Sequence, residues 1–110
     1  MTDDDHGAVL RHMLDALDAA RQIVAGGKEA FDRDPVPRLA SDTVISRLAE
    51  CANKLPAAVL ADMPEVPWSV VRSMRNRLQH ASLDTDYDLV WQVLVTKLPD
   101  IDTAIRRLLD

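Results

Sequence analysis

The sequence predicts an all-α protein: an antiparallel up-and-down helical bundle of four main helices with additional short helices. Hydrophobic residues make up 47% of the 110-residue chain and aromatic residues only 4%, which favours a core of Leu, Val and Ala side chains. Apolar residues recur at three- and four-residue spacing, and no stretch alternates as a half-buried strand would. Short joins favour antiparallel neighbours. The length allows one domain, residues 1–110, with residues 1–7 expected to be flexible.

The first half of the chain predicts two long helices joined by a loop. The first helix ends at Gly26-Gly27, because glycine readily adopts the conformation that closes a helix. Residues 28–40 include two prolines and are expected to form a connecting loop. Ser41 is placed to cap the second helix. The two core stripes are Leu10, Met13, Leu14, Leu17, Ala20 and Val24, and then Val44, Ile45, Leu48, Cys51, Ala52 and Leu55.

The second half predicts a short helical turn after Pro56 and three further helices. Pro67 opens a helix that is expected to reach about Ala81, since proline suits the first helical turn. Asp84, Thr85 and Asp86 can cap the next helix, and Pro99 divides it from the last. The expected buried residues are Val71, Met74, Leu78 and Ala81, then Leu89, Val90, Val93, Leu94 and Leu98, and finally Ile101, Ala104, Ile105, Leu108 and Leu109.

Composition and charge exclude several classes of protein. The single cysteine, Cys51, excludes an intrachain disulfide and is expected in the core. No apolar run is long enough for a membrane span, so a cytoplasmic protein without membrane contact is expected. A net charge of −5 argues against broad, non-specific adhesion to nucleic acid. No metal site and no cofactor are suggested, and Trp68 and Trp91 are expected to be packing anchors.

The helix after Pro67 has one continuous polar face. At about 100° per residue, this face holds Arg72, Arg75, Asn76, Gln79 and His80. A guanidinium can grip two phosphate oxygens as a fork, and an imidazole can transfer a proton near neutral pH. The spacing alone also fits an ordinary solvated face whose basic residues suit a helix C-terminus. A phosphate site and a solvated surface therefore both remain open.

The stretch from Arg75 to His80, with Asp84–Trp91 after it, resembles the HepT-like branch of the HEPN superfamily. The family motif is Arg, four to six residues, His, one residue and Tyr, and residues 42–56 and 66–68 also resemble the family. The resemblance implies a metal-independent endoribonuclease that cleaves RNA by attack of its own 2′-hydroxyl. Arg75 and His80 would be catalytic, and Arg72, Asn76 and Gln79 would bind substrate.

The resemblance also implies a partner and an assembly. Family members form two-fold dimers that bring both motif helices to a shared cleft, so we expect a homodimer in which symmetry supplies a second His80. The biological role would be the toxin of a toxin–antitoxin pair, with a minimal nucleotidyltransferase as antitoxin. In such pairs the motif tyrosine accepts AMP. This chain has Ser82 at that position, which makes Ser82 a possible modification position with less reach and acidity, and Tyr87 lies five residues too late to match.

Two other functions fit parts of the sequence. A non-catalytic subunit could dock a nucleotidyltransferase-fold partner and add a basic surface to the partner's site, which the net negative charge and the absent motif tyrosine favour. A DNA-binding helix-turn-helix fits less well, because the acidic run from Asp84 to Asp88 would face a phosphate backbone.

Overall fold

The computed structural model describes residues 3–78 and 85–110, and every regular element in these two ranges is an α-helix. This confirms the predicted all-α class. None of the described helices is long and apolar enough to cross a membrane. The helices are α1 (Asp3–Ala25), α2 (Lys28–Arg33), α3 (Pro35–Lys54), α4 (Ala57–Ala61), α5 (Trp68–Leu78), α6 (Tyr87–Thr96) and α7 (Leu98–Leu109).

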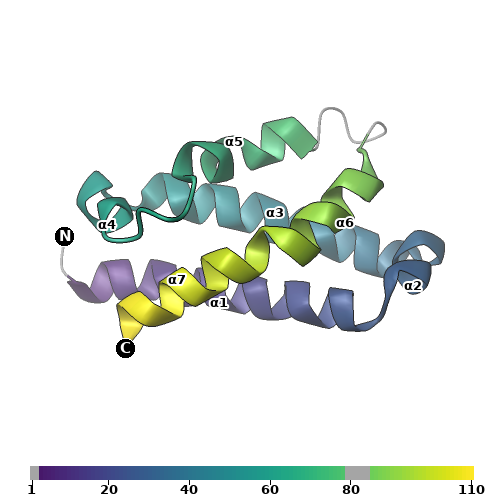
Figure 1. Cartoon of the computed structure of the whole chain (residues 1–110), viewed down its shortest axis with the longest axis horizontal. Coiled ribbons are helices and arrows are strands. Elements are labelled where there is room, and N and C mark those ends of the chain that lie inside the picture. The colour runs from purple at the N-terminus through teal and green to yellow at the C-terminus, as the bar shows by residue number, and fades with distance from the viewer. Residues whose placement is uncertain (1–2, 79–84) are drawn as a thin grey trace.

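The long helices run up and down the bundle in the order of the chain (Figure 1). α1 and α3 lie antiparallel along the molecule, and the short α2 turns the chain between them at one end. α5 then follows α3 back, and α6 and α7 return together to the end that holds the N-terminus. α5 packs chiefly on α3, whereas α6 and α7 pack on α1. The helix that carries Arg72, Arg75 and Asn76 is therefore supported from one side by α3.

The core is made by the apolar stripes that the helical spacing predicts. All six residues of the second predicted stripe are buried, including Cys51, and so are Val71, Met74 and Leu78 of α5. Two predictions in the last helices are wrong, since Leu89 is 45% exposed and Leu109 is 38% exposed. Leu89 borders a surface groove beside α5, and Leu109 is the last residue of α7. Helical periodicity does not distinguish such edge positions from the core.

The loop predicted for residues 28–40 is wrong. The structure has α2 there, and α3 already begins at Pro35. The carboxylate of Asp34 caps α3 by accepting a hydrogen bond of 2.9 Å from the N–H of Val36. A proline costs little in a first turn, where its missing N–H would have no helical partner. Ser41 is therefore not a cap but a buried residue inside α3, with its hydroxyl donating to the carbonyl of Arg38 at 2.6 Å.

α1 covers most of the chain before the glycine pair. α1 begins at Asp3, within the range 1–7 that we expected to be flexible. Gly7 is already buried, so packing reaches into this first part of the helix. The expected break at Gly26-Gly27 is confirmed, because α1 ends at Ala25 and Gly27 has the positive φ of 91° that glycine adopts readily.

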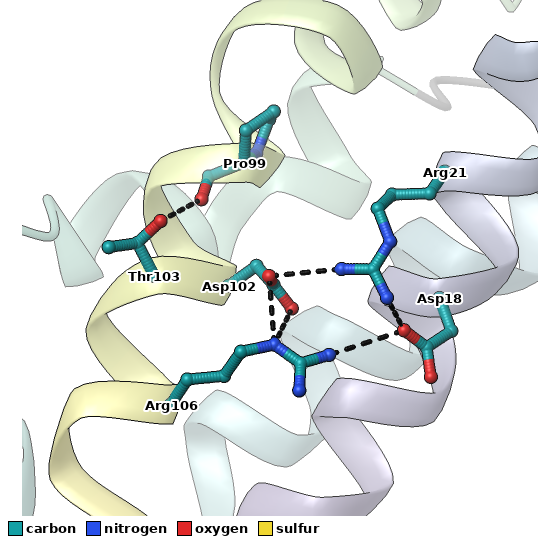
Figure 2. A network of polar contacts seen from close by, with 6 residues as sticks. All are labelled: Asp18, Arg21, Pro99, Asp102, Thr103 and Arg106. Atoms are coloured by element: carbon teal, nitrogen blue, oxygen red, sulfur yellow. Dashed lines mark hydrogen bonds and ion pairs between the residues drawn. The ribbon is translucent and has the colours of Figure 1, made fainter.

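An ion-pair network joins α1 to α7 (Figure 2). Arg21 contacts Asp18 on its own helix and Asp102 of α7, where its Nη1 lies 3.0 Å from the carboxylate. Arg106 of α7 completes the network, because its Nε lies 3.1 Å from Asp102 and its Nη2 lies 3.3 Å from Asp18. Two carboxylates and two guanidiniums thus alternate across the contact between the first and last helices.

The two tryptophans are packing residues, as predicted. Trp68 is buried, and its indole N–H donates to the carbonyl of Met63 at 3.1 Å, which anchors the start of α5. Trp91 lies in α6 with its ring centroid 5.2 Å from that of the buried Phe31. The contact between Trp91 and Phe31 packs the short α2 against α6.

Candidate functional site

α5 begins where the sequence places it. Pro67 stands directly before the helix, and its carbonyl accepts hydrogen bonds from the N–H groups of Val70 and Val71 at 2.9 and 3.1 Å. The helix is described as far as Leu78, the third residue of the predicted core stripe. The predicted continuation to about Ala81 lies outside the described residues.

The polar residues of α5 divide into two groups. Arg72, Arg75 and Asn76 are exposed on the side of the helix that borders the end of α3. Arg77 lies on the opposite side, and its Nε donates to the hydroxyl of Ser73 at 3.0 Å. Arg75 and Arg77 are therefore close in sequence but belong to different surfaces.

A groove of about 410 Å³ lies between α5 and the last turns of α3. The volume is within the range of roughly 300 to 1,000 Å³ that is typical of ligand sites. Arg72, Arg75 and Asn76 form its α5 wall. The α3 wall consists of Ser46, Ala49, Glu50, Asn53 and Lys54. We refer to this hollow as the basic groove.

The basic groove has a positive balance on a chain with a net charge of −5. Arg72, Arg75 and Lys54 supply three positive charges, and Glu50 supplies one negative charge. Glu50 pairs with Lys54 at 3.4 Å, and the two side chains are 67% and 62% exposed. An ion pair this exposed is weak, so an incoming anion can replace the carboxylate. The groove is therefore suited to an anionic group.

The structure brings together three of the residues that the sequence singled out. Arg72, Arg75 and Asn76 share one wall of the basic groove, as their helical spacing predicts. The other three, Gln79, His80 and Ser82, lie outside the described residues. The relation between Arg75 and His80 therefore remains a prediction.

The α3 wall was not predicted as part of the site. Its polar members lie at positions 46, 50, 53 and 54, a spacing that places them on one side of a helix. That spacing was a signal in the sequence, but it is the same as that of any solvated helix face. Only the antiparallel packing of α3 against α5 gives these residues a possible role.

A second groove, of about 650 Å³, lies on the other side of α5, between this helix and α6 and α7. Val70 and Leu89 border it and are 40% and 45% exposed. Arg77, Lys97, Glu65 and Asp100 also line it, so its charges are balanced. We refer to it as the apolar groove.

Tyr87, the only tyrosine of the chain, is held by the fold. Its hydroxyl donates to the carboxylate of Asp42 at 2.7 Å, and the guanidinium of Arg38 lies 5.9 Å from its ring centroid. Burial and the hydrogen bond to Asp42 raise the pKa of the Tyr87 hydroxyl. These contacts give it a structural role at the start of α6.

Within residues 3–78 and 85–110, no group of three or more His, Cys, Asp or Glu side chains could hold a metal ion.

The family model and the relatives that match this chain all point to ribonucleases. The family model described as "Ribonuclease HepT-like" matches residues 13–108. A candidate RNase of Caldanaerobacter subterraneus subsp. tengcongensis is 25% identical over 101 residues, covering 91% of this chain and 90% of the relative. A candidate RNase of Methanocaldococcus jannaschii is 23% identical over 92 residues, covering 84% and 74%. No solved structure matches the chain significantly. The match over nearly the whole bundle places this chain in the HepT-like ribonuclease family.

Proposed function

We propose that this protein is a metal-independent endoribonuclease that uses Arg75 and His80 of its Arg-x4-His motif. The observation that carries the proposal is the basic groove, because it gathers the three described candidate site residues, Arg72, Arg75 and Asn76, on one wall and has a positive balance on an acidic protein. Membership of a ribonuclease family supports RNA as the substrate. RNA carries its own nucleophile, so the chemistry needs a proton acceptor and a group that stabilises negative charge.

The proposed reaction is a transesterification within the RNA chain. His80 removes the proton of a 2′-hydroxyl, and the oxygen attacks the adjacent phosphorus in line as the bond to the 5′-oxygen breaks. The 5′-oxygen leaves with a proton from a general acid. The products are a 2′,3′-cyclic phosphate and a 5′-hydroxyl. Arg75 holds the non-bridging oxygens more tightly as their charge grows, while Arg72, Asn76 and Gln79 bind the flanking chain.

We further propose that the active form is a homodimer with a composite site. One motif helix supplies a single histidine, whereas the reaction is served best by both a base and an acid. A two-fold axis would supply the second His80 from the other copy. The apolar groove supports this proposal, because a two-fold contact requires a surface that complements itself. Exposed Val70 and Leu89, with two basic and two acidic neighbours, provide such a surface.

The proposed biological role is the toxin of a toxin–antitoxin pair, with a nucleotidyltransferase-fold protein as antitoxin. Ser82 stands where the family motif has tyrosine. If the antitoxin modifies this position, the acceptor is an aliphatic hydroxyl instead of a phenol. Masking of the basic groove by the bound partner is the other way in which such a partner would control the site.

The second proposal is a non-catalytic subunit that docks a nucleotidyltransferase-fold partner. Ser82 and the net charge of −5 favour it, since an independent nuclease gains from a basic surface. On this proposal the complex forms equally well with His80→Ala, and the chain expressed alone does not arrest growth.

A product assay distinguishes the two proposals. The purified protein is incubated with single-stranded RNA in the presence of EDTA, and the termini of the fragments are identified. A nuclease of the proposed type gives 2′,3′-cyclic phosphate ends despite the chelator. Intact RNA at high enzyme concentration would contradict the nuclease proposal and leave the docking subunit.

A further inference from the structure

We infer that the α3 wall of the basic groove forms part of the RNA-binding site, with Lys54 contacting a phosphate next to the cleaved one and Glu50 holding Lys54 until RNA binds. This inference rests on the proposed function and extends its site to a second helix. It concerns residues outside the family motif and outside α5.

The first observation behind the inference is the position of Lys54. Lys54 lines the same groove as Arg72 and Arg75, yet it belongs to the last turn of α3. A single-stranded RNA that places one phosphate at Arg75 carries a further charge on each neighbouring nucleotide. Cations on both walls of one groove can contact successive phosphates, which a single row on α5 cannot do as well.

The second observation is the ion pair between Glu50 and Lys54. It is the acidic residue among those lining the basic groove, and it lies four residues before Lys54 on the same helix. The pair is held at 3.4 Å with both side chains mostly exposed, so its net contribution to stability is small. A phosphate that reaches Lys54 must displace this carboxylate and remain close to its negative charge. Glu50 therefore weakens RNA binding while it keeps Lys54 in the groove.

The inference predicts opposite effects for two neighbouring substitutions. Lys54→Gln removes a phosphate contact and weakens the binding of RNA, whereas Glu50→Gln removes the competing charge and strengthens it. A purely structural ion pair would give the same direction for both changes, since either substitution breaks it. The informative result is therefore whether the two substitutions change the affinity for RNA in opposite directions or in the same direction.

The chain offers a matched control. Glu29 and Arg33 form an exposed pair of the same i,i+4 type at 3.0 Å. They lie on α2, which Figure 1 places at the end of the bundle away from the last turn of α3. Glu29→Gln and Arg33→Gln make the same changes in net charge as the two test substitutions without touching the basic groove.

The experiment measures binding of a fluorescent single-stranded 2′-O-methyl RNA, which has no free 2′-hydroxyl to attack, over a series of salt concentrations. We expect Lys54→Gln to raise Kd by roughly three- to tenfold and to lower the slope of log K against log salt by about 0.7, the value for one phosphate contact on a single strand. Glu50→Gln should lower Kd, and both control variants should change it less. With cleavable RNA, Lys54→Gln should raise KM and leave kcat unchanged.

The outcomes separate this inference from the proposed function. If the wild type cleaves RNA and both test variants bind like their controls, the α3 wall is not part of the site and the nuclease proposal stands. If binding shifts as expected but RNA is never cut, the inference is supported and the nuclease proposal falls. Weaker binding by both test variants would overturn the role of Glu50. Unchanged thermal unfolding verifies that the variants are folded.

Discussion

The hydroxyl of Tyr87 donates a hydrogen bond of 2.7 Å to the carboxylate of Asp42, 45 positions earlier in the chain. The bond joins the first residue of α6 to the middle of α3. Asp86 caps α6 beside it, accepting from the N–H of Leu89 at 3.1 Å. The helix that follows the motif region is therefore fixed at its start to the same helix that forms the second wall of the basic groove.

Tyr87→Phe should lower the free energy of unfolding by about 1 to 2 kcal/mol, because a hydrogen bond to a charged acceptor is lost while the ring remains. Urea unfolding of the two proteins measures the difference. A change below the error of the measurement would mean that the bond contributes nothing to stability.

The same bond predicts a dependence on alkaline pH. Burial and Asp42 raise the pKa of Tyr87 above its ordinary value of 10.0. Since the unfolded chain then loses this proton first, the stabilisation is complete below about pH 10 and is lost as the pH rises through the folded-state pKa. The difference between the wild type and Tyr87→Phe should shrink over that window. Ultraviolet titration of the one tyrosine should give a midpoint above that of the urea-unfolded chain.

Asp102→Asn should destabilise the contact between α1 and α7. The Asp102 side chain is only 15% exposed and lies near both Arg21 and Arg106 (Figure 2). We expect a loss of about 1 kcal/mol that diminishes at high salt. Glu29→Gln breaks an exposed pair within one helix and should cost less than about 0.5 kcal/mol. Equal losses of stability in the two variants would show that Asp102 in the network contributes no more than Glu29 in a single exposed pair.

Cys51 should be protected from thiol reagents in the folded protein. It is 8% exposed, and burial raises the pKa of its thiol. Both effects reduce the amount of accessible thiolate. The reaction with a chromogenic disulfide at pH 8 should be slow in buffer and fast in urea. Rapid modification of the native protein would contradict the core position.

Val70→Asp should disrupt the proposed homodimer, because it places a charge in the apolar groove. Val95→Asp is the control, since Val95 is 42% exposed and Val70 is 40% exposed, but Val95 does not line that groove. Light scattering after size exclusion measures the mass. We expect a dimer for the wild type and Val95→Asp, and a monomer with reduced cleavage activity for Val70→Asp. A dimeric Val70→Asp would place the subunit contact elsewhere.

Periodicity predicts most of this fold, and its errors have physical causes. The stripes of α3 and α5 are buried as expected, because each repeats over several turns. The start of α3 was missed because prolines usually end helices, whereas here Asp34 caps the helix and Arg38 donates to the carbonyl of Phe31 at 2.9 Å. A side-chain bond between two helices depends on tertiary packing, which no local pattern reveals.

Only the α5 wall of the basic groove was predicted from the sequence. The α5 wall follows from the spacing of Arg72, Arg75 and Asn76 along a single helix. Lys54 and Glu50 reach the same groove only because α3 packs antiparallel to α5. The sequence distance of about 20 residues between the walls carries no sign of that contact.

The most direct test of the account compares RNA cleavage by the wild type, Arg75→Ala, His80→Ala and Arg33→Ala. Arg33→Ala is the control, since it also removes an exposed arginine but lies on α2 and lines neither groove. We predict a loss of roughly 10²- to 10³-fold for Arg75→Ala, a comparable or larger loss for His80→Ala, and activity near that of the wild type for Arg33→Ala. Equal cleavage rates for all four proteins would contradict the proposed mechanism.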